Sequence, residues 1–310
     1  MKIAFVFSGQ GSQYVGMGKE LADNFSICKN VYDKANEILD FNIRNMIFTG
    51  EKEILDLTEN TQPAILTTSI AINELLKSKG IKPDMVAGLS LGEYSALVAS
   101  EAISFEEALT LVRKRGKIMQ EAVPPGIGKM VAVFGVPLEN LTEIVEKASV
   151  KGVVEIANIN TANQIVIGGE IEAVNYAIEI CKASGARRTI ELQVSGPFHT
   201  SLLNMASVKL LNEINNIEFN EIEIPIISNV TAEVIESKDV IEELLVRQIK
   251  SKVKWMQSVE KMIDLGVTVF IEVGPGRVLS SFVRQIDKNV KVYNVEDLKS
   301  LNNTLESIGV

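Results

Sequence analysis

A serine lies between two glycines in Gly88-Leu89-Ser90-Leu91-Gly92, and this G-x-S-x-G spacing is typical of a serine nucleophile. Such a serine occupies a sharp turn between a strand and a helix, where side chains two positions before and after it have no room. Met85 to Leu89 is apolar like a buried strand, and Tyr94 to Ala99 continues as a helix. Ser90 is therefore the candidate nucleophile, and the backbone N–H of Leu91 is a candidate oxyanion donor. The alternative is an ordinary strand-to-helix loop.

A base for this serine has one candidate, because His199 is the only histidine in the chain. It follows Pro197 closely and precedes a predicted helix from Ser201 to Asn215. The order serine then histidine is that of hydrolase-type sheets. A lone histidine is also common as a structural or surface residue, and that alternative stays open here.

Arg115 is a candidate for binding an anion. The predicted helix from Phe105 to Ala122 begins at a capping box, Ser104 to Glu107, and its apolar stripe has Arg115 at the centre. The other basic residues of this helix fall on the opposite face, at Arg113, Lys114 and Lys117. A guanidinium on an apolar face needs an anion, so it pairs either with a buried Asp or Glu or with a substrate carboxylate.

Gln248 falls on the apolar side of a helix predicted from Asp239 to Val253. A buried amide needs hydrogen-bond partners. It either caps a core backbone group or fixes the imidazole near Ser90.

The first predicted strand, Lys2 to Phe7, leads into the glycine-bearing loop Ser8-Gly9-Gln10-Gly11-Ser12-Gln13. A dinucleotide-binding fingerprint would need a glycine where Tyr14 stands, so that interpretation is weak. We expect instead that the two glycines bring the backbone of Gln10 close to the reacting carbonyl as the second oxyanion donor.

The elements that would position these residues form two parts. Residues 130–194 follow the order strand, helix, strand, strand, helix, strand, which indicates a ferredoxin-like unit, and proline and glycine mark both of its ends. We expect a core of residues 1–126 and 195–310, a small subdomain of residues 127–194, and a catalytic cleft between them. In the core, helices are predicted from Val15 to Phe48 and from Ala64 to Ser78. Core strands are predicted from Ile224 to Ser228, Val267 to Val273 and Val290 to Val295.

Composition narrows the class of protein. The chain has 310 residues, 46% of them hydrophobic, and a formal net charge of −9, which argues against nucleic acid or an anionic membrane as the main partner. Cys28 and Cys181 lack metal or disulfide spacing and fall on apolar helix stripes, so we expect core residues in a reducing compartment. Ile3 to Phe7 is too short for a signal sequence, and no apolar run approaches membrane-spanning length. A cytoplasmic location is the expectation.

Over essentially its whole length the chain resembles the malonyl-CoA:acyl carrier protein transacylases. The motifs that carry this resemblance are Gly9-Gln10-Gly11-Ser12-Gln13, Gly88 to Glu93, Arg115-Gly116-Lys117-Ile118-Met119-Gln120, Pro197-Phe198-His199, the Gln248 helix and Glu272-Val273-Gly274-Pro275-Gly276. The resemblance implies an α/β fold, with a hydrolase-like parallel-sheet core and an inserted ferredoxin-like subdomain. The roles it implies are nucleophile for Ser90, base for His199, clamp on the malonate carboxylate for Arg115, oxyanion donors for Gln10 and Leu91, and histidine support for Gln248.

Two positions depart from the family's usual pattern: Leu89 stands where a histidine precedes the serine, and Ser8 stands where a proline is usual. Both departures concern the local shape and polarity around the serine. Phe198 fits the malonyl-type motif, because its bulk leaves little room for a 2-methyl branch.

The implied reaction moves a malonyl group from malonyl-CoA to the phosphopantetheine thiol of acyl carrier protein through a malonyl-serine, with no metal or other cofactor. A serine esterase or thioesterase and a non-catalytic module that binds carrier protein are the alternatives. We expect the acidic carrier protein to dock beside the local basic cluster of Lys250, Lys252 and Lys254, and the alternative is that these are ordinary solvated surface lysines.

Overall fold

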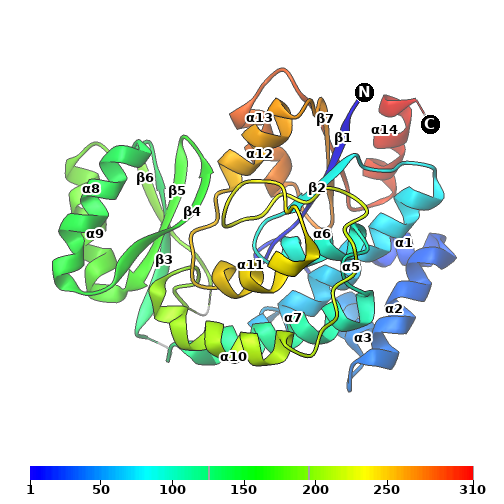
Figure 1. Ribbon diagram of the computed structural model, residues 1–310, viewed down its shortest axis with the longest axis horizontal. Helices are drawn as coiled ribbons and strands as arrows, with labels where there is room; N and C mark the ends of the chain where they lie inside the picture. The colour runs from blue at the N-terminus through cyan, green and yellow to red at the C-terminus, as the bar shows by residue number, and fades with distance from the viewer. Residues whose placement is uncertain (125, 195, 310) are drawn as a thin grey trace.

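The computed structural model describes residues 1–124, 126–194 and 196–309, which form an α/β fold with two separate four-stranded sheets (Figure 1). The first sheet is entirely parallel, in the order β2-β1-β7-β8. Its strands are β1 (Ile3–Phe7), β2 (Met85–Gly88), β7 (Val269–Val273) and β8 (Lys291–Val295). The first three are buried along their whole length, as expected for a parallel sheet covered on both faces.

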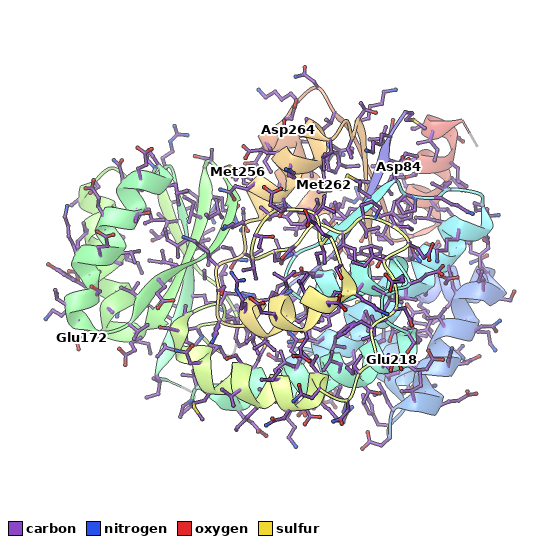
Figure 2. All side chains as sticks on the ribbon, in the orientation of Figure 1. Asp84, Glu172, Glu218, Met256, Met262 and Asp264 are labelled. Atoms are coloured by element: carbon purple, nitrogen blue, oxygen red, sulfur yellow. The ribbon has the colours of Figure 1, made fainter. Side chains whose placement is uncertain are left out.

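Side chains of β1 alternate between the two covering layers of this sheet. Phe5 and Phe7 pack into the larger hydrophobic cluster, while Ala4 and Val6 pack into a second cluster on the other face. The helices that contribute to the larger cluster are α1 (Lys19–Asn24), α2 (Ser26–Ile38), α3 (Ile43–Thr49), α4 (Lys52–Leu55), α5 (Thr58–Ser78), α6 (Gly92–Ala99), α7 (Phe105–Ala122), α10 (Asn204–Ile214), α11 (Ile241–Gln248) and α14 (Leu298–Ile308). The second cluster is covered by α12 (Trp255–Asp264), whose Met262 is labelled in Figure 2, and by α13 (Val278–Ile286).

The second sheet is antiparallel, in the order β4-β5-β3-β6. Its strands are β3 (Gly128–Phe134), β4 (Val154–Thr161), β5 (Gln164–Glu170) and β6 (Arg188–Glu191). Helices α8 (Leu138–Ala148) and α9 (Ile171–Ala183) cover its outer face and enclose a third hydrophobic cluster, in the green part of Figure 1. The predicted strand-helix-strand-strand-helix-strand order is present. Pro125 and Ser195, which belong to the predicted breaks at the two ends of this unit, lie outside the described residues.

The N-terminal helical region differs from the prediction of one helix from Val15 to Phe48. It consists of three short helices, because Phe25 and Leu39 adopt extended backbone conformations. The next helix was predicted to begin at Ala64, but it begins at Thr58 and contains Pro63. A proline at the sixth helical position removes one backbone hydrogen bond, and burial of the helix against its neighbours outweighs that loss.

Two predictions near the site were also wrong. The predicted strand from Ile224 to Ser228 is reduced to isolated bridges, of which Ile226 pairs with Val86. The helix predicted from Asp239 to Val253 has its α-helical part end at Gln248. Beyond that residue Ile249 and Lys250 form a turn, and Val253 exchanges backbone hydrogen bonds with β4, at 2.8 Å to Ala157 and 2.9 Å from Ile159.

The short 3₁₀ helices are Ser149–Lys151, Ser201–Leu203 and Lys238–Val240. Cys28 and Cys181 are both buried, as predicted, and each is a free thiol. Asp84, labelled in Figure 2, accepts a hydrogen bond from the Ile3 N–H at 2.7 Å and so fixes the start of β1 beside β2. No helix in the described residues combines the length and apolar character needed to cross a bilayer.

Candidate active site

Ser90 occupies a tight turn between β2 and α6, as predicted. Its φ of 54° lies in the left-handed region, which a non-glycine residue rarely adopts. A Cβ on Gly88 would lie 2.0 Å from the backbone of Gly92, and one on Gly92 would lie 2.1 Å from the carbonyl oxygen of Phe7. Both glycines of the motif are therefore required by close backbone contacts.

His199 lies beside the serine, with its Nε2 2.7 Å from Ser90 Oγ. Its Nδ1 is 2.8 Å from the backbone carbonyl oxygen of Gln248, which can only accept a hydrogen bond. Nδ1 therefore carries the proton, and the lone pair of Nε2 faces the serine hydroxyl. Burial, and after it the nearby Arg115 guanidinium, lowers the pKa of His199 to about 4, so the ring is a neutral base at physiological pH.

Arg115 points inward from α7, as its helical phase predicted, and is only 1% exposed. Its Nη1 donates to Gln62 Oε1 at 2.8 Å, and its Nη2 donates to Ser90 Oγ at 3.2 Å and to Gln248 Oε1 at 2.9 Å. Within the described residues no carboxylate lies at ion-pair distance from it. The guanidinium is thus held beside the nucleophile by neutral amide oxygens, which an anionic ligand can displace.

Gln248 supports the histidine through its backbone carbonyl, whereas its side chain has a different set of partners. Its Nε2 donates to the Ser90 carbonyl at 2.9 Å and to Glu93 Oε2 at 2.5 Å. Its Oε1 accepts from Arg115. The buried amide that the sequence predicted therefore connects the nucleophile and the guanidinium, and the imidazole is fixed by the main chain of the same residue.

Of the two predicted oxyanion donors, Leu91 directly follows Ser90 in the chain, and Gln10 lines the same cavity as Ser90. Leu91 directly precedes α6 with helical dihedral angles, and Gln10 lies in the loop after β1 with its side chain donating to Thr58 Oγ1 at 3.1 Å. In residues 1–124, 126–194 and 196–309, no acceptor is found for the backbone N–H of Gln10 or Leu91. Both N–H groups are therefore available to an oxyanion.

A cavity of about 250 Å³ opens beside Ser90 and His199 between the two sheets, where the sequence placed a cleft. Phe198, which is buried, and Leu89 contribute to its apolar wall. The small sheet contributes polar groups as well, Asn158 among them. The remaining lining residues are Ser8, Gly9, Gln10, Gly11, Ser12, Met119, Met130, Asn160, Gln164, Val166, Leu192, Val194, Glu272, Val278, Leu279 and Phe282.

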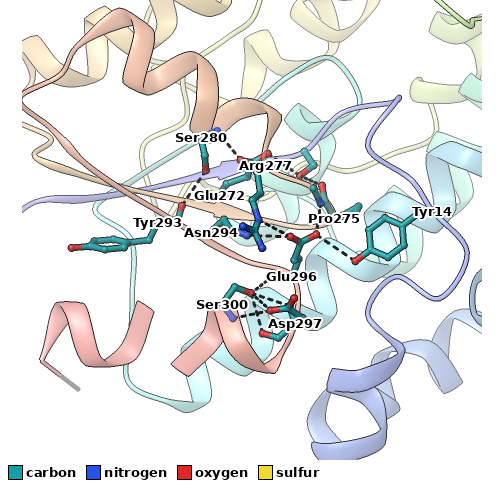
Figure 3. A network of polar contacts seen from close by, with 12 residues as sticks. Tyr14, Glu272, Pro275, Arg277, Ser280, Tyr293, Asn294, Glu296, Asp297 and Ser300 are labelled. Carbon is teal, nitrogen blue, oxygen red and sulfur yellow. Dashed lines mark hydrogen bonds and ion pairs between the residues drawn. The ribbon is translucent and has the colours of Figure 1, made fainter. Parts of the chain in front are cut away.

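One wall of this cavity is fixed by Glu272, at the end of β7 (Figure 3). Its carboxylate accepts the backbone N–H groups of Leu279, at 3.0 Å, and Ser280, at 2.7 Å. Ser8, the departure from the family's usual proline, donates its hydroxyl to the Pro275 carbonyl at 2.9 Å and is buried. These bonds hold the loop after β1 against the start of α13.

Three residues of the site were missed by the sequence analysis: Gln62, Glu93 and Asn229. Glu93 was quoted within the nucleophile motif but given no role. Burial raises the pKa of its carboxyl to about 7, against the opposing effect of hydrogen bonds from Gln248 and Asn229. Gln62 was assigned to a helix-breaking segment, and Asn229 lies in a turn without any periodic pattern.

The predicted docking cluster lies outside the cavity of Ser90. Lys252 is exposed, and Lys250 and Lys254 are half-buried. Lys252 and Lys254 line a second cleft together with Glu260 and Asp264, the latter labelled in Figure 2. The positive charge of this cluster is therefore partly offset by neighbouring carboxylates.

Comparison with known proteins gives consistent matches. A family model described as acyl transferase domain matches residues 4–302. The malonyl CoA-acyl carrier protein transacylase of Bacillus subtilis (strain 168) is 46% identical over 308 residues, covering 99% of this chain and 97% of the relative. The crystal structure of the corresponding Clostridium perfringens protein is 50% identical with a TM-score of 0.97, covering 100% of this chain and 98% of that one. A malonyl-transacylase solved in complex with a type II PKS acyl-carrier protein is 39% identical with a TM-score of 0.97, and the match covers 99% of this chain and 100% of that one.

Proposed function

Because the chain belongs to the malonyl CoA-acyl carrier protein transacylases of the acyl transferase domain family, we propose that it transfers malonyl groups from malonyl-CoA to acyl carrier protein in fatty acid synthesis. The observation that carries this proposal is the contact set of one atom. Ser90 Oγ lies 2.7 Å from a neutral histidine nitrogen and 3.2 Å from a buried guanidinium that has no carboxylate partner among the described residues. A base and an anion-binding group thus converge on a single nucleophile.

The first half-reaction forms the acyl-enzyme. Ser90 Oγ gives its proton to His199 Nε2 and bonds to the thioester carbonyl carbon, whose oxygen becomes the oxyanion received by the N–H groups of Gln10 and Leu91. When the tetrahedral intermediate collapses, the C–S bond breaks. The His199 proton then passes to the departing sulfur, which leaves as the thiol of CoA.

The second half-reaction repeats these steps with a different thiol. The phosphopantetheine thiol of acyl carrier protein gives its proton to His199 and attacks the malonyl-serine carbonyl. The C–O bond to Ser90 breaks, and the histidine proton returns to Oγ. The solved complex of a related malonyl-transacylase with a carrier protein supports this choice of acceptor.

Selection of malonyl groups is assigned to Arg115, with Gln62 as its partner. The free carboxylate of the malonyl group would replace amide oxygens around the guanidinium and gain two charge-assisted hydrogen bonds. Phe198, in the cavity wall beside His199, would exclude a branch at the carbon between the two carbonyl groups. The half-buried Leu89, in place of the family's usual histidine, adds apolar surface to the same cavity.

The division of the chain is part of the proposal. We assign residues 1–126 and 195–310 to a hydrolase-like core and residues 127–194 to a ferredoxin-like small subdomain. The strand order β4-β5-β3-β6 with two helices on one face supports the second assignment.

A cytoplasmic location is supported by two unpaired, buried cysteines. We keep the cluster of Lys250, Lys252 and Lys254 as the docking site for the carrier protein.

Intact-protein mass spectrometry after brief mixing with malonyl-CoA tests the proposal. We expect a stable malonyl adduct that maps to Ser90, is absent from Ser90→Ala, and disappears when acyl carrier protein is added. Release of CoA without a stable adduct would indicate an esterase or thioesterase. Tight carrier-protein binding with neither adduct nor CoA release would indicate a non-catalytic binding module.

A further inference from the structure

Asn229 is a buried residue with hydrogen bonds on both sides of the nucleophile. It is only 1% exposed and lies in the turn after the Ile226 bridge. Its Oδ1 accepts the backbone N–H of Ser90 at 2.7 Å, and its Nδ2 donates to the carbonyl of Gly88 at 2.6 Å. One side chain therefore forms hydrogen bonds with the backbone of Gly88, two residues before the serine, and with the backbone of Ser90 itself.

These two hydrogen bonds stabilise a backbone conformation of Ser90 that is unfavourable by itself. A left-handed φ at a serine costs free energy on the order of 1 to 3 kcal/mol, so the surrounding contacts must impose it. Gln248 holds the Ser90 carbonyl on the other side, at 2.9 Å. The two amides together fix both peptide groups of Ser90 and with them the direction of its Cα–Cβ bond.

The backbone of Asn229 extends the connection to the base. Its N–H donates to Glu93 Oε1 at 3.2 Å, and the other oxygen of Glu93 accepts from Gln248 Nε2 at 2.5 Å. The carbonyl of that same glutamine holds His199 Nδ1 at 2.8 Å. Asn229 is thus linked by two consecutive contacts to the residue that orients the imidazole, and by three to the imidazole itself.

We propose that Asn229 is a positioning residue for acyl transfer, which aims Ser90 Oγ at the thioester by clamping Gly88 and Ser90 while leaving malonyl-CoA binding to other groups. This inference rests on the proposed function. Asn229 does not line the cavity, so it acts through the nucleophile rather than on the substrate. It therefore affects the rate of acylation and not the affinity for the thioester.

The first experiment compares Asn229→Ala with wild type and with Ser228→Ala in single-turnover acylation by malonyl-CoA. Ser228 is a matched control, because it is buried directly before Asn229 and, among the described residues, its hydroxyl accepts only the local N–H of Val230, at 3.2 Å. Displacing the nucleophile by about 1 Å costs roughly a hundredfold in rate, so we expect that loss in Asn229→Ala. We expect the acylation rate of Ser228→Ala, and the Kd for malonyl-CoA of both variants, to change by less than about threefold.

A second variant tests the donor–acceptor requirement and serves if Asn229→Ala does not fold. In Asn229→Asp one carboxylate oxygen still accepts from Ser90, but the other meets the Gly88 carbonyl oxygen and repels it. Protonation of that carboxyl restores an O–H donor to Gly88. The acylation rate of Asn229→Asp relative to wild type should therefore rise as pH falls from about 8 to about 5.5.

The ratio to wild type at each pH corrects for the titration of neighbouring groups that the two proteins share. These groups are Glu93, which contacts the turn directly, His199 across the serine, and the Arg115 guanidinium, all present in both proteins. A purely structural role would lower the unfolding temperature of Asn229→Asp without giving a pH-dependent rate per folded site.

The outcomes separate this inference from the proposed function. If wild type forms no malonyl-serine, the proposed function fails. If wild type is acylated and Asn229→Ala reacts at the wild-type rate, or if the Asn229→Asp ratio is flat with pH, the positioning role is wrong. A loss confined to malonyl-CoA affinity would also overturn it.

Discussion

Replacing Arg115 with alanine should remove the preference for malonyl over acetyl thioesters. The guanidinium is buried over the Tyr94 ring, at 5.1 Å from its centre, and its two terminal nitrogens donate hydrogen bonds to Gln62, Ser90 and Gln248. A malonyl carboxylate that reaches it can take two of these donors in a bidentate geometry. An acetyl group has no carboxylate, so it leaves the amide contacts as they are.

The size of the effect follows from these contacts. Two charge-assisted hydrogen bonds contribute about 1.5 to 3 kcal/mol each, and each displaced amide contact subtracts about 1 kcal/mol. The remainder is on the order of 1 to 4 kcal/mol, with a midpoint of about 2.5 kcal/mol, or roughly 70-fold in selectivity. Arg115→Lys keeps the positive charge but loses the paired donors needed for a bidentate contact, so we expect a selectivity between those of wild type and Arg115→Ala.

The assay is competition between malonyl-CoA and acetyl-CoA in single-turnover acylation, with the two adducts of Ser90 quantified by mass spectrometry. Lys117→Ala is the matched control, since Lys117 is an exposed cation two residues further along the same helix. Its malonyl-to-acetyl ratio should equal that of wild type. An unchanged ratio in folded Arg115→Ala would refute the clamp and leave the arginine a structural role.

Three further predictions concern the base, the amide partner and the docking cluster. If neutral His199 is the base, as proposed, its pKa of about 4 places the lower limb of the acylation pH profile near pH 4, and a limb near pH 6.5 would contradict this. Gln62→Ala should raise the malonyl-to-acetyl ratio by about 0.5 to 1.5 kcal/mol, or roughly 2- to 12-fold, since it removes an amide oxygen that a malonyl carboxylate has to displace from the guanidinium; no change in the competition assay would show that the carboxylate does not displace Gln62. Changing Lys250, Lys252 and Lys254 to glutamate should raise KM for acyl carrier protein more than KM for malonyl-CoA and weaken its salt dependence, and equal KM values at low ionic strength would exclude this docking site.

The residues found from sequence were those with a local pattern. Ser90 lies within a five-residue motif whose glycines have a steric cause, and Arg115 was placed inward by the 3.6-residue period of its own helix. His199 was found by elimination. The inferences about Ser90 and Arg115 used only neighbours in the chain, and the inference about His199 used only the number of histidines in the sequence.

Gln62 was not predicted as a site residue because Pro63 was interpreted as a helix breaker. The first four N–H groups of a helix have no intrahelical partner, so a proline near the start removes little. With Thr58 as the first helical residue, Pro63 forfeits only its own bond to the carbonyl of Glu59. Helical phasing from Thr58 would have turned attention to Gln62, whose side chain is fully buried.

The hydrogen bond from His199 to the backbone carbonyl of Gln248 was missed because the end of this helix was predicted wrongly. In a helix continuing to Val253, the Gln248 carbonyl would accept the N–H four residues later. Because α11 ends at Gln248, this oxygen accepts no N–H four residues later and has only a long backbone hydrogen bond of 3.4 Å from the Ser251 N–H. It is therefore available to His199 Nδ1, and the boundary was set by the pairing of Val253 with β4, which periodicity does not reveal.

The strained backbone conformations of Ser90 and His199 could not be predicted from the sequence either. Ser90 and His199 both have positive φ, at 54° and 60°, where a pattern-based analysis expects glycine. Such conformations persist when contacts from distant segments over-determine them, and the bond from Ser90 to Asn229 spans 139 residues. Free energy gained in folding the rest of the chain therefore holds the nucleophile and the base in orientations that neither residue would adopt alone.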